Sequence, residues 1–239
     1  MELLPNGERA KGVVILFAII LVLEVVNLVS SYMQYSFLQS AASGAFLTME
    51  QADIERIAEA NDLRESVVGF LYLIASIVSG IIFLMWFRRA YANLQTKTDI
   101  QYTPGWAVGS WIVPFINLVR PYQIMKELYV QTKSLLEARG ISVNLSTGIL
   151  GVWWALWLIS GVVGQVVFRM AFRGPETIES LSRVTFGQMI LYALGIPLAL
   201  VAIKVVQDYA KAEPLLAQVS SDKPKLDDEI DVAGKNDDL

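Results

Sequence analysis

Residues 12–33 read GVVILFAIILVLEVVNLVSSYM, an apolar run that contains one charged side chain, Glu24. A helix that crosses the hydrocarbon core of a bilayer needs about 20 such residues at ~1.5 Å each. Three more stretches meet this requirement, at residues 67–87, 147–168 and 187–206. The pattern predicts an all-α integral membrane protein with four transmembrane helices.

The composition supports the membrane class and excludes several kinds of chemistry. Of 239 residues, 54% are hydrophobic, which is high for a soluble domain. The chain has no Cys and no His, so disulfides, thiol nucleophiles, imidazole metal ligands and His-based catalytic pairs are excluded. A Ser-Lys pair or a carboxylate-bound divalent ion remains formally open, but no known motif arranges one. We therefore expect no enzyme activity, no cofactor and no metal.

A fifth apolar stretch, residues 105–119, is too short to span and contains Pro114. The positive-inside rule decides its placement, because Lys and Arg collect in cytoplasmic loops. With four spans and both termini cytoplasmic, 14 basic residues lie inside and five outside. If the fifth stretch also spans, eight lie inside and 11 outside. The count favours four spans, with residues 105–119 as a re-entrant or interfacial segment.

The remaining segments divide the chain around one membrane domain, residues 12–207. Residues 1–11 are predicted to be a cytoplasmic N-terminal segment, and residues 208–239, with nine acids and four bases, a disordered cytoplasmic tail. Residues 121–139 predict an amphipathic cytoplasmic helix that begins at a proline and stops at a glycine. Residues 48–66 predict an acidic extracytoplasmic helix, either a solvated face or a cation or partner site.

Glu24 is a candidate functional residue because a charge inside a bilayer is costly unless it is protonated, paired or facing water. Asn27 and Ser31 follow at helical spacing, so the three side chains form a polar stripe on one face. The stripe is either a hydrogen-bonded seam between helices or a proton or ion pathway. A lone intramembrane carboxylate weakens the transporter interpretation, because many pumps use relays of several acids.

The most unusual segment is residues 86–129, predicted to face the cytoplasm. An amide, a guanidinium and a helix N-terminus meet near residues 117–122, which suits a phosphate or carboxylate ligand. An internal cap that satisfies backbone carbonyls explains the same residues equally well. The candidate binding residues of this segment are Arg88, Arg89, Asn93, Trp106, Asn117, Arg120, Tyr122 and Glu127.

The same segment also carries a family resemblance. Residues 89–94 read RAYANL, residues 103–109 read TPGWAVG and residues 120–123 read RPYQ, with VPF at 113–115 between them. This pattern resembles the signature of the domain-of-unknown-function 4328 family, over roughly residues 65–210. The resemblance implies a bacterial multi-pass protein of the cytoplasmic membrane. It implies no activity, substrate or catalytic residue.

Three functions compete on these observations. The first is a non-enzymatic scaffold or regulator whose cytoplasmic motif binds a protein partner or an anionic lipid headgroup. The second is a small transporter or channel that uses Glu24 and Asn27, and the third, with least support, is an enzyme acting on a lipid. The expected partners are membrane lipids and a membrane or cytoplasmic protein or a second copy of the chain, with no nucleic acid.

Overall fold

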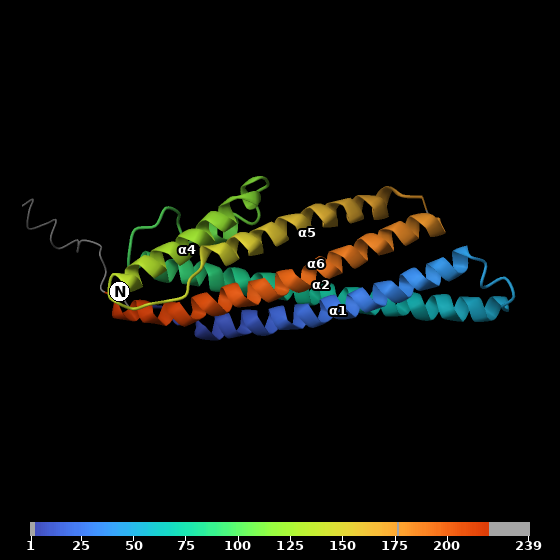
Figure 1. Ribbon diagram of the computed structural model, residues 1–239, viewed down its shortest axis with the longest axis horizontal. Coiled ribbons are helices and arrows are strands. Elements are labelled where there is room, and N and C mark those ends of the chain that lie inside the picture. The colour runs from blue at the N-terminus through green and yellow to red at the C-terminus, as the bar shows by residue number, and fades with distance from the viewer. Residues whose placement is uncertain (1–2, 176, 220–239) are drawn as a thin grey trace, which may run out of the picture. The chain divides into compact units, whose positions relative to one another are not determined.

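The computed structural model describes residues 3–175 and 177–219, and this part of the chain is helical without a strand. Four helices are long and apolar enough to cross a membrane. The elements are α1 (Gly7–Ala42), α2 (Gln51–Gln95), α3 (Trp106–Gly109), η1 (Ile116–Leu118), α4 (Arg120–Glu137), α5 (Thr147–Arg173), α6 (Ile178–Ala212) and η2 (Glu213–Gln218). The chain is therefore an all-α membrane protein (Figure 1).

The chain divides into two compact units, which we name the bundle unit and the motif unit. The bundle unit comprises Lys11–Phe83 and Gly148–Gln207. The motif unit comprises Met1–Ala10, Leu84–Thr147 and Asp208–Leu239, of which residues 3–10, 84–147 and 208–219 are described. The unusual segment of the sequence thus belongs to the motif unit, and the intramembrane polar stripe belongs to the bundle unit.

Aromatic contacts join the helices of the bundle unit. The ring of Phe83 in α2 lies 5.9 Å from Phe17 of α1 and 6.3 Å from Trp153 of α5. Tyr72 of α2 meets Tyr192 of α6 edge to face, with centroids 5.8 Å apart. Figure 1 shows the α1–α2 and α5–α6 connections at the same end of this bundle. Many outward side chains are large and apolar, as expected for helices in contact with lipid.

Two helical boundaries differ from the sequence expectation. One continuous helix, α2, contains most of the predicted acidic helix at 48–66 and all of the span at 67–87. No glycine or proline stands at the junction between them to end a helix. The predicted disordered tail is wrong at its start, since α6 continues to Ala212 and η2 follows to Gln218. Buried Leu216 and Val219 hold this end in place. Residues 220–239 of the predicted tail lie outside the described residues.

Candidate functional site

The motif unit has an aromatic core that fixes its candidate site residues. Trp86, Tyr129 and Tyr209 are fully buried, and Tyr209 lies 6.0 Å from each of the other two rings. Burial raises the pKa of the Tyr129 hydroxyl above its ordinary value, and the charge of Asp208 acts in the same direction. The hydroxyl is therefore neutral. Helix α4 presents Ile124, Met125, Leu128 and Leu136 to the buried side.

A buried polar network ties the N-terminal segment to the ends of α2 and α6. Asn93, 1% exposed, accepts a hydrogen bond from the Leu4 N–H and donates to the Leu4 carbonyl, both at 2.9 Å. The Asn93 amide also donates to Glu213 Oε1 at 2.7 Å. Asn6 donates to both oxygens of Glu213, at 3.1 and 3.0 Å, and to the Trp86 carbonyl. Asn93 is thus part of an internal clasp.

Two basic side chains extend this clasp to η2. The buried Lys97 ammonium donates to the Val219 carbonyl at 2.8 Å, and Arg139 donates to the Gln218 carbonyl at 3.0 Å. The half-buried Arg89 acts electrostatically on the Glu213 carboxylate. These contacts satisfy two carbonyls at the end of η2 and offset buried charge.

Arg120, the first residue of α4, is held by aromatic rings. Its guanidinium carbon lies 4.5 Å from the centroid of Tyr102 and 5.5 Å from that of Trp106. Arg120 forms no ion pair within residues 3–175 and 177–219. Tyr102 is fixed in turn by a 3.3 Å hydrogen bond from its hydroxyl to Gln123. The two rings orient the guanidinium, and no carboxylate of the described residues pairs with its charge.

Residues 110–119, named the apolar loop, lead directly into Arg120. No continuous helix covers this segment, which consists of turns and η1. Ile112 is 74% exposed and Phe115 84% exposed. Phe115 has φ 63°, an uncommon backbone conformation for a bulky residue, and it marks a tight reversal of the chain. The loop therefore presents apolar side chains outward from the motif unit.

Glu127 has a structural role, because its hydrogen bonds hold neighbouring segments of the motif unit together. Its carboxylate accepts hydrogen bonds from the Tyr91 hydroxyl and from the Gln101 backbone N–H, the latter at 2.6 Å. The Tyr102 N–H donates to the Tyr91 hydroxyl at 3.2 Å. The α2–α3 connection is thereby fastened to α4, which places Tyr102 under the Arg120 guanidinium.

The structure separates the other predicted binding residues. Arg88 is exposed, whereas Asn117 and Tyr122 are half-buried. The Asn117 backbone N–H donates to the Val113 carbonyl at 3.0 Å within the apolar loop. Trp106 and Arg120 come together, while Asn93 and Glu127 make internal hydrogen bonds instead.

The bundle unit holds the second candidate, Glu24. It is 4% exposed and its Oε1 accepts a hydrogen bond from the Tyr72 hydroxyl at 2.7 Å. Its Oε2 has no hydrogen-bond partner among the described residues. The carboxylate packs directly on Gly195 of α6, where an added Cβ would clash with it. Asn27 instead donates to its own helix, at the Leu23 carbonyl.

The polar stripe continues into contacts with α2. Arg64 donates to the Ser30 hydroxyl at 3.0 Å and to the Ser30 carbonyl at 3.3 Å. Ser30 also bonds Glu65, and Asn61 bonds Gln34. Ser31 is buried at 2% exposure. The hydrogen bonds between α1 and α2 are therefore made by Ser30 and Gln34 next to the stripe, and within the stripe by Glu24 through its Oε1.

The comparison with known families decides the identity. The model of the domain of unknown function DUF4328 matches residues 50–211, about two thirds of the chain. The protein belongs to the DUF4328 family. No curated protein and no solved structure matches the chain.

The DUF4328 match includes one of the two candidate sites, that of Arg120, and excludes the other, that of Glu24. It contains α2, the apolar loop, α4 and α5, including the Tyr102, Trp106 and Arg120 arrangement. Glu24 in α1 and the clasp residues Asn6 and Glu213 lie outside it. The aromatic-held arginine is thus part of the family domain.

The sequence does not predict the buried contacts of three residues of the motif unit, Asn6, Lys97 and Glu213. Asn6 and Glu213 are 207 positions apart, and no motif marks either of them. Lys97 lies within the quoted segment, but a lysine in a loop is ordinarily solvated. No local signal marks Glu213 either, because an acid in a polar stretch next to a proline is ordinarily solvated.

Proposed function

We propose that this DUF4328 protein is a non-enzymatic scaffold or regulator of a bacterial cytoplasmic membrane whose motif unit binds an anionic lipid headgroup at the cytoplasmic face. The observation that carries the proposal is Arg120, stacked on Tyr102 and Trp106 directly after the apolar loop. A stacked guanidinium keeps its edge N–H groups available, and these match the paired oxygens of a phosphate.

The apolar loop supplies the second half of such a site. Exposed Ile112 and Phe115 are stable in the interfacial layer of a bilayer, where apolar side chains leave water while nearby cations meet the headgroups. Residues 88–139 contain seven bases and three acids, so the segment attracts anionic lipids. The same excess of bases supports a cytoplasmic location.

Replacing Arg120 with glutamine is expected to weaken insertion of the apolar loop into membranes that contain phosphatidylglycerol. A cysteine at Ile112, labelled with an environment-sensitive fluorophore, reports insertion in nanodiscs, because the chain has no other thiol. Loss of one charge-assisted contact should lower the equilibrium constant for insertion at a fixed phosphatidylglycerol fraction about tenfold.

The matched control is Lys133→Gln, which removes a cation of α4 that pairs with Glu137 at 3.7 Å. It should leave the insertion curve unchanged. Equal insertion into phosphatidylcholine and phosphatidylglycerol nanodiscs would refute the headgroup proposal. A curve for Arg120→Gln that coincides with that of the parent protein would refute the role of Arg120.

A second candidate function, proton transport, is favoured by one observation, the buried Glu24 oxygen without a hydrogen-bond partner. Glu24→Gln keeps the size of the side chain and the contact with Tyr72 but cannot release a proton. If Glu24 carries protons, this change should reduce potential-driven proton flux into proteoliposomes at least tenfold, a loss typical of removing a proton-transfer group. Glu59→Gln, at an exposed site of α2, is the control. Equal fluxes in parent and Glu24→Gln proteins would exclude this pathway.

A further inference from the structure

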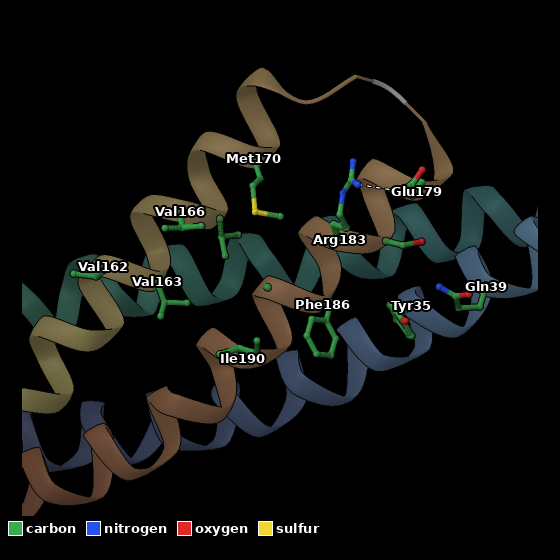
Figure 2. Close-up of a pocket in the computed structure, with 13 residues that line it drawn as sticks. Tyr35, Gln39, Val162, Val163, Val166, Met170, Glu179, Arg183, Phe186 and Ile190 are labelled. Atoms are coloured by element: carbon green, nitrogen blue, oxygen red, sulfur yellow. Dashed lines mark hydrogen bonds and ion pairs between the residues drawn. The ribbon is translucent and has the colours of Figure 1, made fainter.

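A groove of about 620 Å³ opens in the bundle unit between α5, α6 and α1. Figure 2 shows its lining side chains projecting from these three helices. Its volume lies within the ~300–1,000 Å³ common for small-ligand sites. The groove is built from the bundle unit alone, so it is distinct from the Arg120 site of the motif unit.

The wall of the groove is aliphatic. Val163, Val166 and Met170 of α5 face Phe186 and Ile190 of α6 across it. These side chains offer no hydrogen bond to a polar ligand, so the interior suits a hydrocarbon chain.

Gly187 fixes how closely the two helices approach at the floor of the groove. A Cβ at this position would lie 2.8 Å from Cγ2 of Val167, closer than real Cβ contacts. Helix α6 therefore packs directly against α5 at Gly187. Larger residues on either side keep the two helices apart and leave the groove open.

The mouth of the groove is polar. Glu179 and Arg183, one turn apart on α6, form an ion pair at 2.9 Å beside the α5–α6 connection (Figure 2). Gln39 and Tyr35 face the mouth from α1. The arginine and glutamate side chains are 58% and 81% exposed, and an ion pair in that setting contributes little, so a ligand can replace it at low cost.

The length of the groove matches one leaflet. From Val162 to Met170, α5 rises about 12 Å, and from Glu179 to Ile190, α6 rises about 16 Å, at ~1.5 Å per residue. Half of a ~30 Å hydrocarbon core is about 15 Å. The charged pair therefore lies at headgroup depth when the aliphatic wall reaches the middle of the bilayer.

We propose that this groove holds one phosphatidylethanolamine molecule of the leaflet that faces the α5–α6 connection. One acyl chain lies along the aliphatic wall. The phosphate accepts hydrogen bonds from Arg183, and the primary ammonium donates to Glu179, so each charge of the existing pair exchanges one partner for another. A second copy of the chain fits less well, because a transmembrane helix needs a groove that crosses both leaflets.

Native mass spectrometry of the full-length protein in detergent tests the proposal, with phosphatidylethanolamine, phosphatidylcholine and phosphatidylglycerol added separately. Using the Arg120→Gln background keeps the result independent of the headgroup site proposed above. Phosphatidylethanolamine should bind about tenfold more tightly than the other two, since only its headgroup offers a positively charged hydrogen-bond donor to the carboxylate. Glu179→Gln should abolish that preference.

Val163→Trp should fill the groove and reduce binding of all three lipids, whereas Val152→Trp, elsewhere on α5, should not. Thermal unfolding shows whether each variant is folded, and Glu179→Gln, at an exposed site, keeps the test decisive if Val163→Trp fails to fold. Equal binding of the three lipids would overturn the proposal. So would a disulfide-linked dimer formed through Val166→Cys, which would assign the groove to a second copy.

Discussion

Replacing Asn93 with leucine is expected to lower the free energy of unfolding by about 4 kcal/mol, because it leaves several buried polar groups unsatisfied at ~1–3 kcal/mol each. Three hydrogen bonds end at this amide: one from the Leu4 N–H, one to the Leu4 carbonyl and one to the Glu213 carboxylate. Leucine has nearly the same size, so the loss comes from polar groups and not from a cavity. Denaturant titration in detergent micelles measures it.

Asn144→Leu is the matched control, since Asn144 also lies in the motif unit but is exposed. It should change the free energy of unfolding by less than about 0.5 kcal/mol, as surface substitutions ordinarily do. Equal effects of the two substitutions would show that the clasp around Asn93 contributes no stability to the motif unit.

Replacing Gly195 with alanine is expected to destabilise the bundle by about 2 kcal/mol, the usual cost of forcing a methyl group into a packed interface. The added Cβ would clash with the Glu24 carboxylate, so this side chain must shift and give up its hydrogen bond with the Tyr72 hydroxyl. Glu24→Ala removes the obstructing group. The double variant should therefore recover part of the loss, with a coupling energy of about 1–2 kcal/mol in a double-mutant cycle.

Gly151→Ala is the control for this second prediction, because a Cβ at Gly151 of α5 meets nothing within 4 Å. Alanine is the better helix former, so this variant should be neutral or slightly more stable. Additive effects of Gly195→Ala and Glu24→Ala would mean that the two residues do not pack against each other.

Hydropathy predicts where the chain crosses a membrane but not where its helices end. The four apolar runs all lie within long helices, and α2 continues from the predicted acidic helix through the span to Gln95. Polar residues can extend a helix in water at no cost to the apolar part, so composition alone does not mark the boundary. The polar composition after residue 208 misleads for the opposite reason, because a few buried side chains such as Leu216 are enough to order η2.

The candidate site is predictable only where its residues are neighbours in sequence. Trp106 and Arg120 belong to one recognisable segment, and they do come together. Asn93 belongs to that segment too, but its partners are Leu4 and Glu213, 89 and 120 positions away. Such contacts depend on how distant segments pack, which helical periodicity does not encode.

Labelling of single cysteines in intact cells tests the central claim most directly, that residues 86–129 of the motif unit lie on the cytoplasmic side of four spans. Suitable positions are exposed in the structure: Glu59, Gln101, Lys126 and Glu179. Cysteines at 59 and 179 should react with an impermeant maleimide from outside, and those at 101 and 126 only after permeabilisation. Labelling of Lys126→Cys in intact cells would contradict the account, because the apolar loop would then cross the membrane and carry Arg120 to the opposite face.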